Sequence, residues 1–262
     1  MDLGINGRKA IVNGGSAGLG KGSARALAEE GAELFLAARG EERLMATVEE
    51  LSRETGASIT PVVADHSTDE GRDKILAACP EPDILVSTCS PPPFSGDFRQ
   101  VSREDWLQHL EMGLVGPVEF MKAVVDGMAE RGYGRIVNIT TGAAKHPAEI
   151  RVLSGPPRAA LSNYTTAISK VVAKHNVVIN NLLPGMHHTA AAQERFGAAA
   201  AERGISYDEI VEEWCEQWGI AANRFGDPDD FGAICALLCS RQANYLVGQD
   251  IVVDGGVGNS TF

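Results

Sequence analysis

Short apolar runs rich in β-branched residues recur along the chain, separated by segments long enough to form a helix. Runs without regular alternation of apolar and polar positions are typical of strands buried on both faces of a parallel sheet. The segments between most of them, such as GLGKGSARALAEEG and PDDFGAICALLCS, have helical patterns. This alternation predicts a doubly wound parallel α/β sheet of about seven strands. The predicted strands are residues 9–15, 33–39, 58–65, 83–88, 135–141, 177–185 and 250–256.

The sheet pattern continues without a linker or a shift in composition, which predicts a single domain over residues 1–262. Only residues 190–225 interrupt it, and this stretch is rich in Ala, Glu and Trp. We expect a helical insertion there, before the last helix and strand, that serves as a lid over the substrate. Trp214 and Trp218 are four residues apart, so they would share a helix face in the core of that lid.

The charge and cysteine content restrict the ligands and the cellular compartment that we expect. A formal net charge of −12 works against a broad nucleic-acid or anionic-membrane surface, so an anionic ligand would need a local site. The N-terminal residues are too poor in apolar side chains for a signal peptide, and no apolar run approaches the roughly 20 residues of a membrane span. The five cysteines show no metal-type CxxC spacing, which favours reduced thiols in a cytoplasmic protein.

The first predicted strand leads directly into NGGSAGLG, where Gly14, Gly18 and Gly20 precede a helix. Glycines at this spacing allow a tight turn and a close approach of the backbone to a pyrophosphate, which the helix N-terminus attracts. A glycine-rich turn without a ligand is the alternative. Its place after the first strand of a βαβ unit favours dinucleotide binding.

The second predicted strand ends in AARGEER, where an NAD site would place a carboxylate for the ribose hydroxyls. Arg39 stands there instead and suits a 2′-phosphate, which favours NADP(H) over NAD(H), although a solvated Arg39 paired with Glu41 or Glu42 is the alternative. After the third strand, Asp65 is expected either to accept a hydrogen bond from the adenine amino group or to cap the helix beginning near Thr68.

Four segments together resemble the short-chain dehydrogenase/reductase family over nearly the whole chain: NGGSAGLG, GRIVNIT, NNLLPGMHHT and GQDIVVDGG. The resemblance implies a seven-stranded Rossmann-type fold and a homotetramer or homodimer built on paired helices. It also implies hydride transfer between a nicotinamide cofactor and a small carbonyl or alcohol substrate, with a tyrosine as the proton donor or acceptor. The cofactor-binding residues that we assign from the turn and this resemblance are Gly14, Ser16, Gly18, Leu19, Gly20, Arg39, Asp65, Thr88, Cys89, Arg158, Pro184, Gly185 and Thr189.

The chain differs from the family at the positions of the catalytic residues. The family's Asn-Asn-Ala-Gly after the fourth strand aligns with Ser87 to Ser90, and its helix asparagine aligns with Gly113. Its serine aligns with Thr141, its tyrosine with Ser154 and its lysine with Arg158, the last fixed by the match of RAAL to Lys-Ala-Ala-Leu. The chain is therefore similar to a divergent, ketoacyl-carrier-protein-reductase-like branch in which Ser and Arg replace Tyr and Lys.

Ser154 and Arg158 cannot repeat the usual proton transfer. Serine is a much weaker acid than tyrosine, and Arg158 stays protonated, so it can hold the nicotinamide ribose and stabilise an oxyanion but cannot relay a proton. A helix cap by Ser154 would need the N–H groups of Pro156 or Pro157, which have none. We expect the helix to begin close to Pro157 and the Ser154 hydroxyl to face either a ligand or a structural partner.

Histidines near the inferred site are candidates for the missing acid or base. His187 and His188 follow the Pro-Gly turn and are assigned as catalytic with Thr141, Ser154 and Arg158, while His146 is a further candidate. A solvated or packing role is the alternative for each, and no metal site is predicted. The leading hypothesis is an NADP(H)-dependent oxidoreductase with an altered catalytic tetrad. Non-redox carbonyl chemistry and non-catalytic dinucleotide binding are the alternatives.

Overall fold

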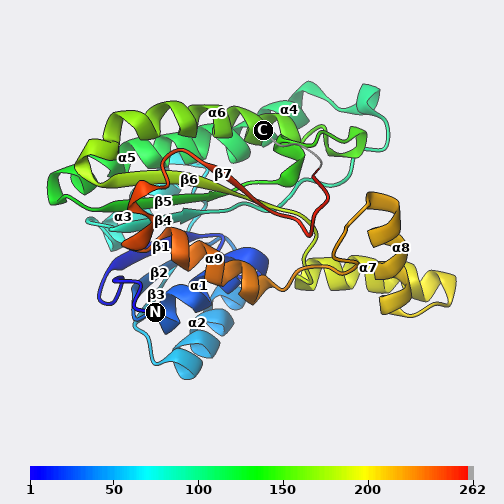
Figure 1. Cartoon of the computed structure of the whole chain (residues 1–262), viewed down its shortest axis with the longest axis horizontal. Helices are drawn as coiled ribbons and strands as arrows, with labels where there is room; N and C mark the ends of the chain where they lie inside the picture. The colour runs from blue at the N-terminus through cyan, green and yellow to red at the C-terminus, as the bar shows by residue number, and fades with distance from the viewer. Residues whose placement is uncertain (259–262) are drawn as a thin grey trace.

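A computed structural model describes residues 1–258 and contains one sheet of seven parallel strands in the order β3-β2-β1-β4-β5-β6-β7 (Figure 1). All strand pairs are parallel, which confirms the predicted doubly wound sheet. The chain reverses its direction of winding between β1 and β4, where open α/β sheets hold their ligands. The strands are β1 (Lys9–Asn13), β2 (Glu33–Ala38), β3 (Ile59–Val63), β4 (Ile84–Ser87), β5 (Gly134–Ile139), β6 (Val177–Pro184) and β7 (Asp250–Val253).

Helices cover both faces of this sheet (Figure 1). One core lies between the sheet and α1, α2 and α9, and a second lies between the sheet and α3, α5 and α6. Strands β1, β2, β4, β5 and β6 are almost wholly buried, which explains why their sequences do not alternate apolar and polar positions, whereas the edge strands β3 and β7 are mostly half-buried. The helices are α1 (Gly18–Glu29), α2 (Glu41–Thr55), α3 (Asp69–Ala78), α4 (Arg103–Leu110), α5 (Gly116–Arg131), α6 (Gly155–Val172), α7 (Ala190–Arg203), α8 (Tyr207–Trp218) and α9 (Pro228–Leu238).

Helices α1 and α9 approach each other closely because both carry glycine at the contact. A Cβ atom on Gly22 of α1 would overlap the carbonyl of Pro228 in α9. A Cβ atom on Gly232 of α9 would overlap the backbone of Gly22 in return. This backbone-to-backbone contact holds α1, and therefore the turn before it, against the C-terminal part of the chain.

The sequence SREDWLQHLEMGLVGPVEFMKAVVDGMAERG has one continuous helical pattern, but the structure divides it into α4 and α5. A π-helical turn, Glu111–Val115, separates the two helices. Pro117 has no N–H to continue the α-helical bonding, and a widened turn of this kind absorbs the mismatch. The turn carries Gly113, the position that aligns with the family's asparagine, and places it against the start of α6.

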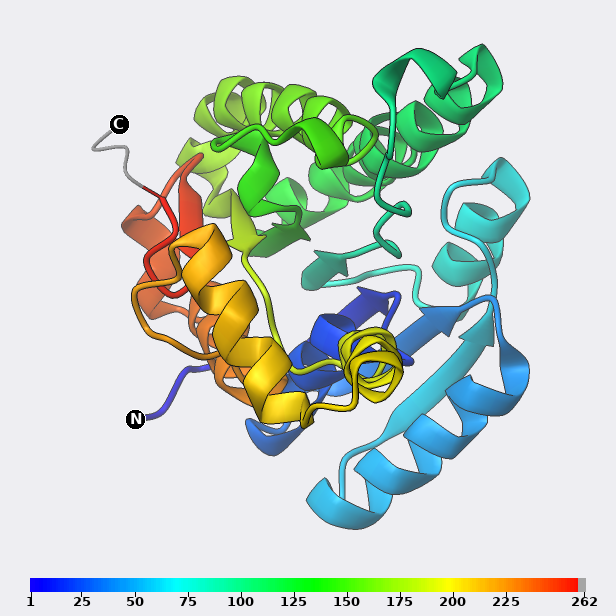
Figure 2. The same cartoon turned by 90° about the vertical axis from the view of Figure 1, so that its right-hand side faces the viewer.

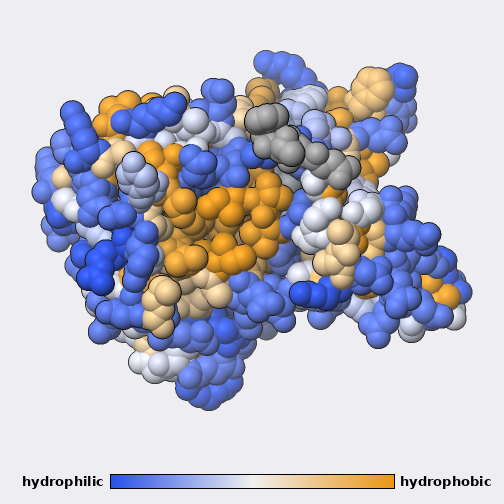
Figure 3. Space-filling view, viewed as in Figure 1, coloured by the Kyte–Doolittle hydropathy of each residue, from blue (hydrophilic) through white to orange (hydrophobic). Residues whose placement is uncertain are grey.

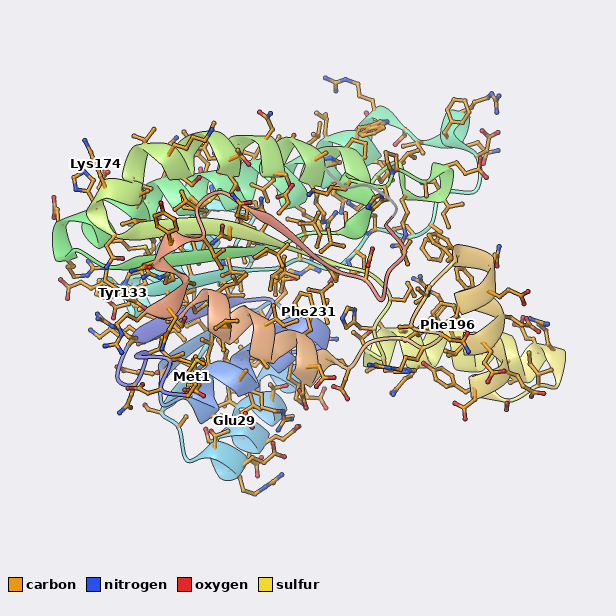
Figure 4. All side chains as sticks on the ribbon, in the orientation of Figure 1. Met1, Glu29, Tyr133, Lys174, Phe196 and Phe231 are labelled. Carbon is orange, nitrogen blue, oxygen red and sulfur yellow. The ribbon has the colours of Figure 1, made fainter. Side chains whose placement is uncertain are left out.

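Helices α7 and α8 form the predicted helical insertion. Figure 2, viewed from the end where β6 leads into α7, shows both helices in front of the sheet. They have a small apolar core of their own around Phe196, whereas Phe231 belongs to the core beside the sheet (Figure 4). Trp214 and Trp218 stack at 5.6 Å against that small core, which confirms that they share a face.

Apolar side chains gather on the face formed by α9 and β7 (Figure 3). Leu237 on α9 and Leu246 before β7 are each 42% exposed, and Ile251 and Val253 on β7 are only partly covered. Within residues 1–258, no helix combines the length and the apolar character that a membrane crossing requires. The five cysteines are all free thiols, and only Cys89 is not fully buried.

Candidate active site

The turn between β1 and α1 requires glycine at three positions. Gly14 and Gly18 have φ values of +70° and +53°, which favour glycine, and a Cβ atom on Gly14 would lie 2.7 Å from the Thr88 carbonyl oxygen. A Cβ atom on Gly20 would overlap the carbonyl of Gly14. Ala17 precedes α1 and offers no side-chain cap, so N–H groups of the first helical turn lack a side-chain acceptor. The turn therefore fits the pyrophosphate of a dinucleotide.

Two other predicted cofactor residues complete this turn. Ser16 is buried, and Leu19 packs against the core below the turn. Thr189, at the start of α7, accepts a hydrogen bond from the Ala192 N–H, and its methyl group would lie 3.3 Å from a Cβ atom on Gly18. The base of the α7–α8 insertion therefore touches the glycine-rich turn.

Two guanidinium groups border the turn beside the end of β2. Arg39 is 63% exposed, and its Nη1 lies 3.7 Å from Asp65 Oδ2. Arg43 was not predicted, and its Nε donates to Ser16 Oγ at 3.4 Å. Its position one helical turn after Arg39 is the sequence signal that would have found it.

Asp65 does not cap the next helix, which corrects one of its two predicted roles. Thr68 caps α3, since its side chain accepts from the Gly71 N–H. One oxygen of Asp65 instead accepts from the N–H and the hydroxyl of Ser67, at 3.0 and 2.7 Å. Its role toward adenine stays a prediction.

Arg158 lies at the centre of the site in which the family's catalytic residues are replaced. It is 4% exposed, and its Nη2 donates to Cys89 Sγ at 2.8 Å while its Nη1 lies 3.4 Å from Ser154 Oγ. The hydroxyl of Ser154 makes no cap, as the two prolines predict. Four residues on a helix separate Ser154 and Arg158, so the side chains meet on one face. The loop after β4 thus joins α6 through Cys89.

Helix α6 begins at Gly155, two residues before Pro157, so the prediction that Gly155 and Pro156 lie outside the helix was wrong. Both prolines lie in its first turn. N–H groups there have no intrahelical acceptor, and the fixed φ of proline matches the helix, so proline is tolerated at these positions. This overrides the tendency of a residue before proline to stay extended.

Gly113 leaves room for the arginine. A Cβ atom at this position would lie 3.1 Å from Pro157 Cβ and 3.7 Å from Arg158 Nη1. Thr88, Cys89 and Arg158 line a small hollow with Gly113. The aligned change from asparagine to glycine is therefore packed against the aligned change from lysine to arginine.

His66 also lines this hollow, and the sequence reasoning missed it. Its Nε2 is buried without a hydrogen-bond partner among the described residues. Burial lowers its pKa to about 4, so the ring stays neutral at neutral pH. Its place directly after Asp65, at the carboxyl end of β3, is the only sequence signal for it.

His66 should make the stability of the protein depend on pH. Because its pKa is lower in the folded protein than in the unfolded chain, the unfolded chain binds more protons as the pH falls, and stability falls with it. Between about pH 6.5 and 4.5, we expect the free energy of unfolding to drop by about 2 kcal/mol more in the wild type than in His66→Gln.

Urea unfolding at a series of pH values measures this difference. His175→Gln, at an exposed position before β6, is the matched control and should keep the wild-type pH dependence. The same dependence in His66→Gln and wild type would contradict the expectation.

Thr141 follows β5 and lies beside the start of α6. Its Oγ1 accepts from the Ala143 N–H at 3.3 Å, and a Cβ atom on Gly155 would lie 2.8 Å from the Ala143 carbonyl oxygen. Pro184 ends β6, and a Cβ atom on the next residue, Gly185, would lie 2.7 Å from Asp254 Cα. The structure brings these segments to the same end of the sheet.

The two predicted catalytic histidines have different surroundings. His187 is buried, its Nδ1 lies 3.2 Å from the Gly185 carbonyl oxygen, and its ring packs edge-on against Phe231 at 5.2 Å. Burial lowers its pKa, and its contacts with Gly185 and Phe231 favour a packing role. His188 is partly exposed, and its Nδ1 lies 2.9 Å from the Tyr207 hydroxyl. Catalysis by either stays a prediction.

The site therefore has a connected part and a separate part. Contacts join the glycine-rich turn, Thr88, Cys89, Ser154 and Arg158, whereas the described contacts of His187 and His188 are with the loops and helices around α7 to α9. Among residues 1–258, no three His, Cys, Asp or Glu side chains cluster as metal ligands would. A doubly wound parallel sheet with this turn at its switch point defines a Rossmann-type nucleotide-binding protein.

Comparison with known proteins defines the family. The family model described as enoyl-(acyl carrier protein) reductase matches residues 14–258. The human dehydrogenase/reductase SDR family member 4 is 30% identical over 251 residues, which cover 94% of this chain and 86% of the relative. The chain belongs to the short-chain dehydrogenase/reductase family of oxidoreductases.

Solved structures agree with this assignment. L-sorbose reductase from Gluconobacter frateurii, complexed with NADPH and L-sorbose, is 26% identical with a TM-score of 0.93 and covers 99% of this chain and 100% of its own. A short chain oxidoreductase from Pseudomonas aeruginosa PAO1, described as containing an atypical catalytic center, is 25% identical with a TM-score of 0.90. The matched regions cover 97% of this chain and 98% of that chain.

Proposed function

We propose that the protein is an NADP(H)-dependent oxidoreductase that acts on the carbonyl or hydroxyl group of a small molecule without the usual tyrosine and lysine. Arg158 carries the proposal, because its buried guanidinium is held by Cys89 and Ser154 next to the loop that contacts the glycine-rich turn. The NADPH complex of the L-sorbose reductase supports the choice of cofactor. A bound nicotinamide would supply or accept the hydride.

The residues of the chain would bind and orient. The glycine-rich turn would hold the pyrophosphate, and Thr141 and Ser154 would orient the substrate oxygen by hydrogen bonds. Arg158 would stabilise negative charge that develops on that oxygen and contact the ribose, but it would not give up its proton. His188 is the better of the two predicted histidines for supplying a proton, because His187 is buried.

The surrounding elements suggest two further roles. We keep residues 190–225 as a lid in a single-domain protein, because α7 begins where Thr189 touches the glycine-rich turn. The apolar face of α9 and β7 suits an interface of a homodimer or homotetramer (Figure 3). A cytoplasmic location and the absence of nucleic-acid and membrane partners stay predictions.

Arg39 and Arg43 should decide between the two cofactors. We expect the wild type to bind NADPH more tightly than NADH, and the Arg39→Ala/Arg43→Ala variant to lose about tenfold in NADPH affinity because charged hydrogen bonds to the 2′-phosphate disappear. Calorimetric titration with each cofactor measures both constants. Arg53→Ala, at an exposed position on the helix that carries Arg43, should change neither the NADPH affinity nor the NADH affinity. Equal affinity of the wild type for NADH and NADPH would contradict the role given to the two arginines.

Oxidation of NADPH in the presence of ketones, with L-sorbose among them, tests the proposed activity. Turnover of any ketone supports the reductase. Cofactor binding with no turnover in either direction over the ketones and their alcohols would favour non-redox carbonyl chemistry or a binding role. Absence of binding for both cofactors would overturn the proposal.

A further inference from the structure

Two arginines that are not among the predicted catalytic residues lie against the ring of Phe94. The Arg151 guanidinium carbon is 4.4 Å from the ring centroid, and that of Arg195 is 4.6 Å away. Arg151 ends the 3₁₀ turn Glu149–Arg151, Arg195 lies on α7, and Phe94 is in the loop after β4. The group therefore joins the proposed lid to the body of the protein.

Neither arginine has a carboxylate partner among residues 1–258, although the chain as a whole is strongly acidic. Arg99 also lies over a phenylalanine, with its guanidinium carbon 4.4 Å from the centroid of the Phe98 ring. It differs from Arg151 and Arg195 because it pairs with Asp97 at 3.1 Å. Arg151 is only partly exposed, and within residues 1–258 the only hydrogen bond of its guanidinium is from Nη2 to Met186 Sδ at 3.6 Å.

Burial, together with the nearby Arg195 and Arg158, lowers the pKa of Arg151 to about 10. A guanidinium in such a place is costly unless an anion reaches it. The phenylalanine ring holds both cationic groups in place, since cations bind aromatic faces. The two guanidinium groups are thus prepared for a negative ligand that the described chain does not supply.

The position of this group relates it to the reacting end of the site. The Ser154 N–H donates to the Arg151 carbonyl oxygen at 2.9 Å, so Arg151 precedes Ser154 by one turn. Met186, which contacts Arg151, follows Pro184 and Gly185. An anion at Arg151 would therefore lie next to the segment that leads into Ser154 and to the loop after β6.

We propose that Arg151 and Arg195 bind the carboxylate of a substrate whose carbonyl or hydroxyl group lies at Thr141, Ser154 and Arg158. The substrate class is then an oxo acid or the corresponding hydroxy acid. This inference rests on the proposed function, because it concerns the charged end of the same substrate. Guanidinium groups suit this task, since they bind carboxylates through paired hydrogen bonds. Arg195 would also bring α7 toward the bound substrate.

Binding of acids and their esters to the wild type tests the assignment without turnover. In the presence of NADP⁺, calorimetric titration compares 2-oxo and 3-oxo acids, such as pyruvate and acetoacetate, with their methyl esters and with inorganic phosphate. We expect at least one acid to bind about tenfold or more tightly than its ester. If no acid binds more tightly than its ester, or if phosphate binds more tightly than every acid, the carboxylate assignment is overturned.

Variants then identify the residues. Arg151→Met and Arg195→Met should each remove most of the preference for acid over ester, and the two lysine variants should keep part of it. Arg99→Met is the matched control and should keep the full preference, since it removes a charge over a phenylalanine elsewhere in the same loop. Thermal unfolding checks the fold, and Arg195→Met, on the exposed side of α7, provides the test if Arg151→Met is unstable. An unchanged preference in Arg195→Met and in folded Arg151→Met would overturn the residue assignment.

The test separates this inference from the proposed function. A preference for acids without NADPH oxidation would overturn the reductase and leave the anion site. NADPH oxidation with neutral ketones, without a preference for acids, would leave the reductase and overturn the anion site.

Discussion

Replacing Arg158 by methionine should lower kcat/KM by about a hundredfold or more with any ketone that the enzyme reduces. The variant keeps much of the side-chain volume but loses the positive charge that contacts both Ser154 and Cys89. Loss of one donor that stabilises an oxyanion typically costs about 10²–10³ in rate. Steady-state kinetics at saturating NADPH measures the effect.

Three further variants locate the source of that loss. Arg158→Lys keeps the charge and should retain more activity than Arg158→Met. Ser154→Ala should reduce kcat by about tenfold, because one of two orienting hydroxyl groups remains. Cys89→Ala tests the positioning of Arg158 and should alter KM for NADPH more than kcat. Wild-type kinetics in Arg158→Met would show that the arginine takes no part in the reaction.

Replacing Gly22 by alanine should have the largest effect on stability, about 3 kcal/mol or more in the free energy of unfolding. The added methyl group would overlap the Pro228 carbonyl, and this atom belongs to backbone that cannot move away as a flexible side chain can. Urea unfolding followed by circular dichroism measures the change.

Gly197→Ala on α7 is the matched control. Nothing lies within 4 Å of a Cβ atom at this position, so alanine should leave stability unchanged or raise it, as expected from its higher helix propensity. A Gly22→Ala variant as stable as wild type would show that α1 and α9 are free to separate.

The fold could be predicted from the sequence because its signals are local. Each of the seven predicted strands is found, with ends that differ by up to three residues. The strand runs lack regular alternation of apolar and polar positions, which indicates a parallel sheet between two layers of helices, and the glycine spacing after β1 requires the turn that is observed. The insertion was predicted as helical because residues 190–225 lack the strand pattern.

The errors arise where packing between distant segments overrides a local tendency. Gly155 precedes proline yet starts α6, and Pro117 lies in a continuous pattern but is accommodated by a π-helical turn. No local pattern marks either outcome, because each depends on which backbone groups have acceptors in the folded chain.

The site could be predicted from the sequence only in part, for the same reason. Aligned motifs locate Ser154 and Arg158, but the partnership of Arg158 with Cys89 spans 69 positions in sequence. Arg151 and Arg195 likewise lie in separate segments, and only the fold brings both to Phe94. His66 carries no motif, so only its burial beside Arg158 distinguishes it from the other histidines.

The close packing of Gly113 against Pro157 and Arg158 makes the order of substitutions matter for anyone who engineers the site back to the family pattern. An asparagine introduced at 113 first would compete for space with the guanidinium and the proline ring. A lysine introduced at 158 first would vacate part of that space, after which the asparagine has room. The route to the usual tetrad therefore begins on α6, and the two positions form one epistatic unit.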